Sequence, residues 1–160
     1  MSRILVVYHS RTGNTAKMAD AVASGAKSAG ADVVLKKVSD ATLEDMLGAD
    51  GIIMGSPTYY GQMAAEIKQL FDGSTEIRGR LENKIGAAFT SSGSPDGGNQ
   101  TALLSMLMAM MIHGMIIVGD PMSSGGHYGA IAVGEPGAAA LDACRQIGSR
   151  VAILAIKLKA

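Results

Sequence analysis

The stretch that decides the fold is VVYHSRTGNTAKMA, residues 6–19. A run of β-branched residues ends in a polar turn around Gly13, and a helical pattern follows at once. This junction puts free backbone N–H groups and the positive end of a helix dipole at the end of a buried strand. Four hydroxyl or amide side chains surround the glycine: Ser10, Thr12, Asn14 and Thr15. The pattern predicts a phosphate site, the alternative being an ordinary helix cap with turn residues.

Apolar strands and helical segments alternate five times along the chain. The predicted strands are Arg3–Tyr8, Asp32–Val38, Asp50–Gly55, Lys84–Thr90 and Met115–Val118. The predicted helices are Asn14–Ala29, Thr42–Leu47, Gly61–Phe71, Gly98–Ile112 and Ala138–Leu158, with a long glycine-rich loop over Asp120–Gly137. Such alternation predicts an α/β fold with a parallel sheet and helices on both faces. No linker or repeat interrupts it, so we expect residues 1–160 to form a single domain.

Composition narrows the possible partners and compartments. Fourteen basic and fourteen acidic residues give zero formal net charge, which argues against nucleic-acid binding and against a strongly acidic docking surface. One cysteine excludes an internal disulfide and favours a reducing compartment. The apolar start of the chain is too short for a signal peptide, and no window approaches a transmembrane span. We therefore expect a cytoplasmic protein without membrane insertion, and no residue spacing indicates a metal site.

Two further loops follow predicted strands. Residues 56–62, SPTYYGQ, set Tyr59 beside Tyr60 ahead of Gly61, which suits the packing of a flat ring, or else forms a simple capping turn. Residues 91–99, SSGSPDGGN, can offer backbone N–H groups to an electron-rich ring edge, or else form a flexible loop. Since carboxyl ends of parallel strands meet at one edge of a sheet, all three loops should converge there. A phosphate site, an aromatic platform and a polar rim together fit flavin mononucleotide (FMN).

The same segments carry a family resemblance over nearly the whole chain. SRTGNT, GSPTYYGQMAAEIKQLFD and TSSGSPDGGNQT resemble the three flavin-binding segments of the flavodoxin superfamily. HGMIIVG, GGHYGAIAVGEP and VAILAIKLKA narrow the resemblance to the tryptophan-repressor-binding-protein family of flavodoxin-like NAD(P)H:quinone oxidoreductases. It implies a five-stranded parallel sheet of order 2-1-3-4-5, non-covalent FMN, and two-electron transfer from NADH or NADPH to quinones. It also implies a homodimer or homotetramer with active sites between subunits.

The resemblance assigns residues to parts of the flavin. It places the phosphate against Ser10, Arg11, Thr12, Gly13, Asn14 and Thr15. It places the ring beside Pro57, Thr58, Tyr59, Tyr60 and Gly61. The pyrimidine and ribityl side falls to Ser91, Ser92, Gly93, Ser94, Gly97 and Gly98. The chain departs from the family in lacking tryptophan and in being shorter, mainly between the second and third strands.

Three residues are expected to serve catalysis. His113, in the HGM motif, matches a histidine near the flavin across a subunit boundary; the alternative is a structural histidine at a helix C-terminus. His127 and Tyr128 stand in GGHYG where the family has GG-x-PYG, and we expect them at the rim of the active site as donors to quinone oxygens. A solvated loop position is the alternative for His127.

Two other functions stay open from the sequence. A flavodoxin-type carrier would pass single electrons between protein partners, although such carriers usually dock through an acidic face. A scaffold that uses FMN only for stability is the third possibility. Residues 98–112 are apolar on all sides, so part of that helix should pack on the sheet and the remainder suggests a subunit interface.

Overall fold

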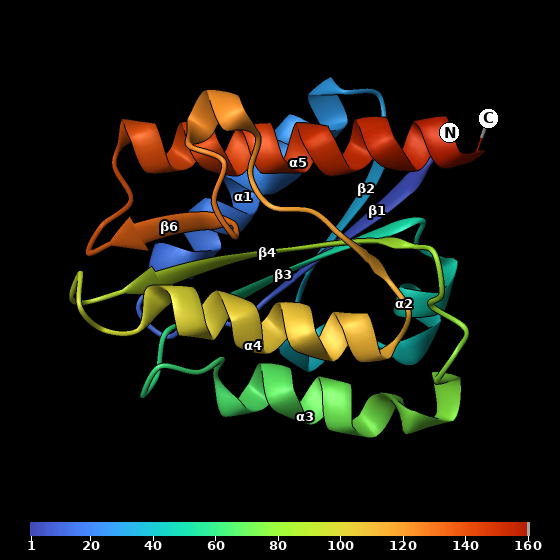
Figure 1. The fold of residues 1–160 in the computed structure, drawn as a ribbon, viewed down its shortest axis with the longest axis horizontal. Helices are drawn as coiled ribbons and strands as arrows, with labels where there is room; N and C mark the ends of the chain where they lie inside the picture. Colours follow the sequence, from blue (N-terminus) through green and yellow to red (C-terminus); the bar gives the residue numbers. More distant parts are fainter. Residues whose placement is uncertain (160) are drawn as a thin grey trace.

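A parallel sheet between two layers of helices forms the core of the computed structural model, which describes residues 1–159 (Figure 1). The strand order β2-β1-β3-β4-β5 and the helices on both faces confirm the predicted architecture. The strands are β1 (Arg3–Tyr8), β2 (Asp32–Lys37), β3 (Gly51–Pro57), β4 (Ile85–Ser92), β5 (Ile116–Ile117) and β6 (Ala130–Val133). The helices are α1 (Asn14–Ser28), α2 (Leu43–Gly48), α3 (Ala65–Gly73), α4 (Asn99–Ile112) and α5 (Ala138–Lys159).

Side chains of each central strand alternate between two hydrophobic layers. Ile4 and Val6 of β1 pack with α1 and α5, while Leu5 and Val7 pack on the other face with α2, α3 and α4. All four are at most 1% exposed. Burial on both faces explains why these strands read as continuous apolar runs in the sequence.

The prediction of a loop over Asp120–Gly137 is wrong for Ala130–Val133, which form β6. The two residues of β5 pair only with Ile85 and Gly86 at the start of β4. β6 takes the other half of β4, with Phe89 opposite Ala130 and Ser92 opposite Val133. Gly129 and Gly134 flank this short strand, so the sequence pattern there is typical of a glycine-rich loop and not of a strand. One of them, Gly129, runs so close to β4 that a Cβ atom would lie 2.1 Å from the carbonyl oxygen of Ala88.

The start of α3 and the ends of two strands also differ from the prediction. β3 and β4 each continue two residues further, through Pro57 and Ser92, so that the predicted loops begin inside the sheet. The predicted helix over Gly61–Phe71 begins only at Ala65, because a tight hairpin occupies the segment before it. The hydroxyl of Ser56 accepts the N–H of Ala64, the residue just before the helix, at 2.7 Å.

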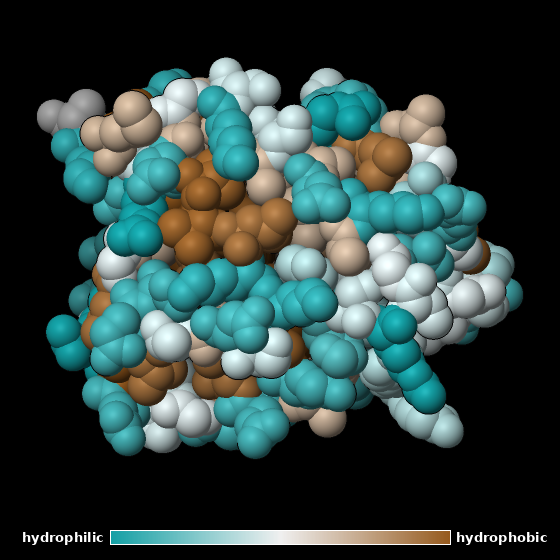
Figure 2. Space-filling view, turned by 180° about the vertical axis from the view of Figure 1, so that it is seen from behind, coloured by the Kyte–Doolittle hydropathy of each residue, from teal (hydrophilic) through white to brown (hydrophobic). Residues whose placement is uncertain are grey.

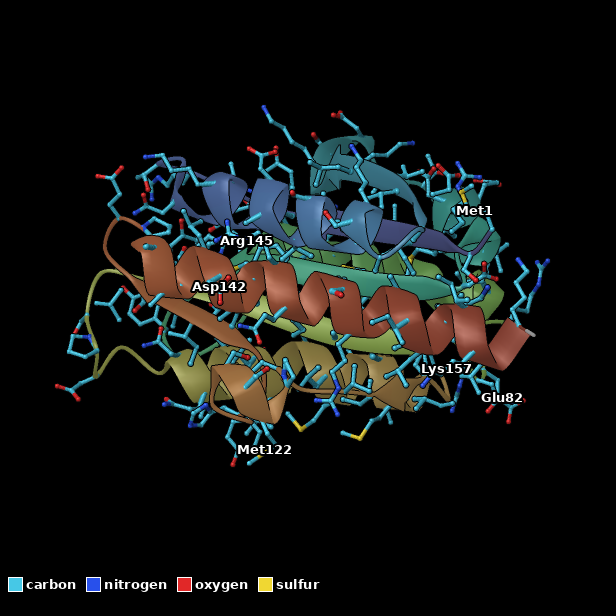
Figure 3. All side chains as sticks on the ribbon, turned by 90° about the horizontal axis from the view of Figure 1, so that it is seen from above. Met1, Glu82, Met122, Asp142, Arg145 and Lys157 are labelled. Atoms are coloured by element: carbon cyan, nitrogen blue, oxygen red, sulfur yellow. The ribbon has the colours of Figure 1, made fainter. Side chains whose placement is uncertain are left out.

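Helices α1 and α5 touch through backbone rather than through long side chains. A Cβ atom on Gly25 would lie 1.9 Å from the carbonyl oxygen of Arg145, and one on Gly148 would lie 2.1 Å from that of Val22. Figure 3 shows the two helices side by side over the sheet, with Arg145 at their border. The buried thiol of Cys144 lies in the core beneath α5, and burial raises its pKa to about 12, which keeps it in the unreactive thiol form.

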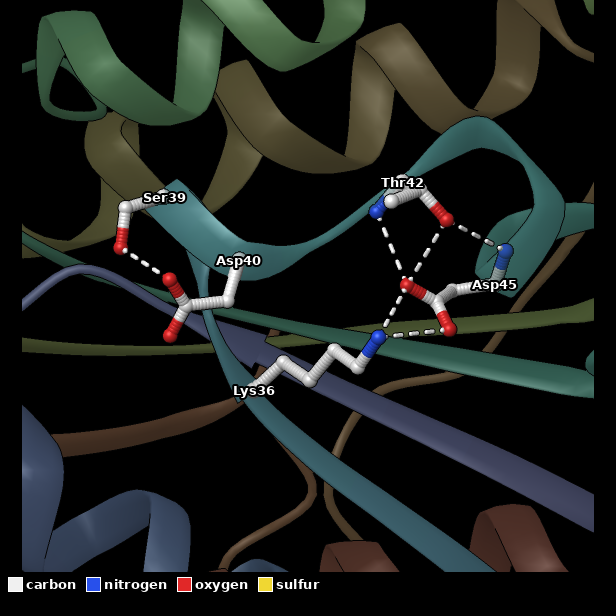
Figure 4. Close-up of polar contacts among 5 residues, drawn as sticks. All are labelled: Lys36, Ser39, Asp40, Thr42 and Asp45. Atoms are coloured by element: carbon white, nitrogen blue, oxygen red, sulfur yellow. Dashed lines mark hydrogen bonds and ion pairs between the residues drawn. The ribbon is translucent and has the colours of Figure 1, made fainter.

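β2 forms one edge of the sheet and leads into α2 through a short connection. Thr42 caps α2 in a reciprocal arrangement with Asp45, and Lys36 of β2 donates to both carboxylate oxygens of Asp45 at 2.9 and 2.7 Å (Figure 4). Although burial raises the pKa of Asp45, these hydrogen bonds outweigh it and hold the pKa below its usual value.

On the opposite side of the molecule from the view of Figure 1, a patch of apolar surface is exposed (Figure 2). Among residues 1–159, no helix has both the length and the apolarity needed to cross a bilayer.

Candidate functional site

The first loop leaves the start of α1 open. Gly13 adopts φ +100°, and a Cβ atom there would meet nothing within 4 Å. The hydroxyl of Ser10 accepts the N–H groups of Gly13 at 3.1 Å and Ala16 at 3.3 Å. Within residues 1–159, the N–H groups of Asn14 and Thr15 have no acceptor, and the first turn of α1 has no acidic residue. Two free N–H donors at the positive end of a helix, with no carboxylate beside them, are what a phosphate site requires.

Hydroxyl groups tie the three loops together at the carboxyl edge of the sheet. Thr15 of the first loop shares a hydrogen bond of 2.8 Å with Ser91 of the third, and both are buried. The N–H of Thr58 in the second loop donates to the carbonyl of Ser91 at 2.7 Å. The Thr58 hydroxyl also pairs with that of Thr90 at 2.8 Å. The predicted convergence of the loops is therefore fixed by buried polar contacts rather than left to loop mobility.

The second loop presents Tyr60 on a strained hairpin tip. Tyr59 and Gln62 exchange both backbone hydrogen bonds at 3.0 Å. The two residues between them, Tyr60 and Gly61, have φ angles of 49° and 72°. Positive φ at both central positions is typical of the type I′ turn, which glycine or asparagine usually occupies. Tyr60 is fully solvent-exposed, so neither packing nor backbone preference explains a tyrosine at this position.

Replacing Tyr60 with glycine should stabilise the fold. The substitution relieves the left-handed conformation and removes no buried surface, so the free energy of unfolding should rise by about 1 kcal/mol. Urea denaturation measures it. Tyr59→Gly is the matched control, since Tyr59 has an ordinary φ and should lose stability instead. Equal destabilisation by both changes would contradict the strain.

The third loop is held by two hydrogen bonds to the carbonyl group of Ser94, and its Gly98 contacts Gly61 of the second loop. The carbonyl oxygen of Ser94 accepts the hydroxyl of Ser92 at 2.7 Å and the N–H of Gly97 at 3.2 Å. Gly98 has φ +87°, and a Cβ atom on it would lie 2.6 Å from the Cα atom of Gly61. The predicted residues Gly61 and Gly98 are thus in backbone contact, which a larger residue at position 98 would prevent.

A hollow of about 330 Å³ lies where the three loops meet, and we call it the edge hollow. Its walls come from all three loops and from the end of β6. The residues that line it are Arg11, Thr12, Asn14, Pro57, Thr58, Tyr59, Ser91, Ser92, Gly93 and Gly134. Its size lies at the lower end of the range for small-molecule sites in proteins. Nine of the seventeen sequence-predicted flavin residues line the hollow, and the other eight, which do not line it, are Ser10, Gly13, Thr15, Tyr60, Gly61, Ser94, Gly97 and Gly98.

His127 and Tyr128 line a different cavity, of about 800 Å³, between β6 and the start of α5. β6 separates them from Gly134 at the edge hollow by a strand of four residues, about 13 Å. The backbone N–H of His127 donates at 2.7 Å to the carboxylate of Asp120, which is 3% exposed and anchors this segment. Both predicted side chains are exposed, and neither lines the edge hollow.

His113 lies at the opposite end of α4 from the third loop, about 20 Å away along the helix. It is 7% exposed. Its Nε2 atom is 2.7 Å from the hydroxyl of Ser74, which in turn donates to the carbonyl of Phe71 at 2.6 Å. Since that hydroxyl has one proton, Nε2 must carry the hydrogen that it donates to Ser74. Nδ1 is then a bare acceptor, and it has no partner among the described residues.

The burial of His113 predicts a loss of stability in acid. Burial, and secondarily the charge of Arg78, lowers the pKa of His113 below its ordinary value of 6.5. The unfolded chain therefore binds a proton more readily, so the contribution of neutral His113 is complete above pH 6.5 and is lost as the pH falls below it. Urea denaturation between about pH 7 and pH 5 should show a steeper decline for the natural chain than for His113→Gln. Identical slopes would contradict it.

Known proteins share this fold and are similar in sequence over nearly the whole chain. Residues 36–130 match the model of the NADPH-dependent FMN reductase family. The chain belongs to this family. It is 40% identical to an NAD(P)H dehydrogenase (quinone) of Archaeoglobus fulgidus over 99% of this chain and 100% of the relative. It is 43% identical to a flavodoxin of Aquifex aeolicus over 95% and 86%. The solved structure of a WrbA-like flavodoxin from Agrobacterium tumefaciens superposes with a TM-score of 0.84 at 31% identity, covering 98% of this chain and 99% of that one.

The edge hollow of this FMN reductase family member suits its cofactor. The open N-terminus of α1 fits a phosphate, Tyr59 offers an aromatic wall, and the glycine-rich third loop lets backbone approach a ring. Sequence reasoning missed Gly134, which lines the hollow and donates its N–H to the carbonyl of Ser92 at 2.7 Å. It also missed Thr90 and Asn99, whose side chains both contact the Thr58 hydroxyl. Thr90 lies inside a strand, where a hydroxyl does not distinguish a site residue from any other. Asn99 follows two glycines and begins α4, so the sequence did offer a signal for it.

Proposed function

We propose that this protein binds FMN in the edge hollow and transfers two electrons from NADH or NADPH to a quinone. The observation that carries the proposal is the buried hydroxyl network that holds three strand-end loops around one open helix N-terminus. Its relatives named NAD(P)H dehydrogenase (quinone), aligned over nearly the full chain, support the reaction class. The proposal treats residues 1–160 as a single FMN-binding domain in the cytoplasm, which one continuous sheet and one free cysteine support.

The chain's residues would bind and orient the cofactor, and FMN when bound supplies the hydride chemistry. The N–H groups of Asn14 and Thr15 would hold the phosphate, helped by the hydroxyl of Thr12. Tyr59 and Tyr60 would flank the ring and exclude water from it. Backbone N–H groups around Gly93 would stabilise negative charge that develops on the ring, because fixed dipoles need no reorganisation.

Catalytic roles for His113, His127 and Tyr128 belong to the same proposal and require a second copy of the chain. The outer face of α4 and the nearby β5 expose Met108, Met111, Ile112 and Ile116. These apolar side chains support a homodimer or homotetramer in which that face is covered. His113 follows the last residue of the same helix, so a subunit contact over this face would bring a neighbouring subunit close to it. His127 and Tyr128 would donate to the quinone oxygens from the exposed segment before β6.

One observation favours a second candidate, the one-electron carrier. The relative that is 43% identical is named a flavodoxin. Against it stand the balanced charges of the chain, because a carrier usually docks through an acidic face. The size of the protein in solution bears on the choice, since a monomer favours the carrier and an oligomer favours the reductase.

The visible spectrum of the FMN-loaded protein under anaerobic conditions tests both candidates. Rapid bleaching of the flavin by NADH or NADPH, followed by recovery of the yellow colour on adding a quinone, is the expected result. A bound flavin that stays oxidised with both donors would overturn the reductase and leave the carrier. A protein that does not retain FMN at all would overturn both.

A further inference from the structure

A third cavity, of about 690 Å³, lies on the other side of the first loop from the edge hollow, and we call it the β2 cavity. The ends of β1 and β2, the β2–α2 connection and α3 enclose it. Tyr8, His9 and Ser10 form its wall toward the first loop. Arg11 and Thr12, the next two residues, line the edge hollow. The two cavities are therefore neighbours across the first loop.

The β2 cavity has an apolar floor and a polar rim. Its apolar residues are all half-buried: Tyr8, Val38, Ala41, Leu43 and Leu70. Polar side chains surround them, among them Ser39 and Thr42 of the β2–α2 connection, which Figure 4 shows beside Asp40 and Asp45 respectively. An apolar surface with a few polar groups at its margin suits a flat heterocycle carrying polar substituents.

Lys37, at the rim of the β2 cavity, is a cation that forms no structural contact among residues 1–159. Lys36 is engaged by Asp45, as Figure 4 shows, but the adjacent Lys37 has no hydrogen-bond or ion-pair partner among residues 1–159. His9, also at the rim, lies with its Nε2 atom 3.6 Å from the carboxylate of Glu66. Lys37 is thus the charged group left available to an anion in the β2 cavity.

The cavity lies next to the short connection between β2 and β3. The connection runs from Val38 to Asp50 and holds a single turn and the six-residue α2. The apolar residues of the cavity floor stay half-buried beside this connection, so the floor is accessible to a ligand.

We propose that the β2 cavity binds the adenosine end of the nicotinamide dinucleotide that reduces the flavin, with the purine on the apolar floor and the 2′-phosphate of NADPH paired with Lys37. The inference rests on the proposed function, because the nicotinamide must reach the ring in the edge hollow. A dinucleotide crossing the first loop would lay its diphosphate near Arg11, which has no ion-pair partner among residues 1–159. Lys37 is a binding residue and takes no part in hydride transfer.

Steady-state kinetics of the FMN-loaded enzyme with two donors test the inference. Lys37→Gln should raise KM for NADPH about tenfold and leave kcat unchanged, since one charge-assisted contact is lost. Ala41→Phe should fill the floor and raise the same KM. Neither variant should alter KM for reduced nicotinamide mononucleotide, which lacks the adenosine. Lys157→Gln, an exposed lysine near the end of α5 (Figure 3), is the matched control and should change nothing.

A binding measurement separates failure of the inference from failure of the proposed function. Adenosine 2′,5′-bisphosphate should bind the FMN-loaded protein in a calorimeter, and Lys37→Gln should weaken that binding about tenfold. Turnover with NADPH that neither variant affects would overturn the β2 cavity as the adenosine site while the reductase stands. If no donor is oxidised, the proposed function fails, and the bisphosphate titration still decides whether the cavity binds an adenosine phosphate.

Discussion

Gly148→Ala is expected to destabilise the fold by about 3 kcal/mol or more. The added methyl group would lie 2.1 Å from the carbonyl oxygen of Val22, and that atom is backbone, so no side-chain rotation relieves the clash. Helix propensity favours alanine over glycine by about 1 kcal/mol, which is too little to offset it. Gly25→Ala meets the carbonyl oxygen of Arg145 at 1.9 Å and should behave alike. Urea denaturation followed by circular dichroism gives both values.

The matched control is Gly48→Ala at the last position of α2. A Cβ atom there would meet only the Arg3 guanidinium, at an ordinary 3.7 Å. Alanine should therefore be neutral or stabilising by up to about 1 kcal/mol. An insoluble Gly148→Ala protein beside a soluble Gly48→Ala protein would fulfil the same expectation. Equal stability of all three variants would show that α1 and α5 do not approach as closely as described.

Asn14→Asp is expected to weaken FMN binding about 100-fold. The substitution keeps the size of the side chain and places a negative charge at the open start of α1, where the phosphate is proposed to bind. Like charges brought together cost several kcal/mol, and about 3 kcal/mol corresponds to that factor. The same charge favours the helix dipole, so the free energy of unfolding of the FMN-free protein should rise slightly. Fluorescence titration with FMN measures the affinity.

Riboflavin supplies the decisive comparison, because it has the same ring and no phosphate. Its affinity should be equal in the natural chain and in Asn14→Asp. The control is Asn83→Asp, because Asn83 lies just before β4, at the amino ends of the strands and away from the three loops. This change should leave both affinities unchanged. Equal loss for FMN and riboflavin would place Asn14 at the ring and not at the phosphate.

The sequence predicted the sheet well and the details of its carboxyl edge less well, for physical reasons. β1, β3 and β4 are buried on both faces, so their apolar runs identify them and the helices between them fix the parallel order. β6 has four residues and pairs with β4 only because β5 ends early, which no local pattern records. Pairing decided at a distance lies outside what periodicity can show.

The same distinction applies to the candidate site: local sequence features could be predicted, and contacts between distant residues could not. The residues of the three loops were predictable because strand ends, glycines and turn residues leave local marks. The link between Thr15 and Ser91 joins positions 76 residues apart, and nothing in either segment announces it. His113 and His127 were singled out by motif alone, and their distance from the loops depends on the length of α4 and on the register of β6.

The division of β4 between two partners has a consequence for how this protein can change over time. β5 and β6 pair with separate stretches of β4, and the chain between Val118 and Gly129 leaves the sheet and returns to it. Neither pairing depends on the length of that excursion, so insertions or exchanges there would leave both registers intact. His127 and Tyr128, the proposed donors to the acceptor, lie on this excursion. If they act as proposed, changes in acceptor choice would not disturb the strand pairing that positions the cofactor loops.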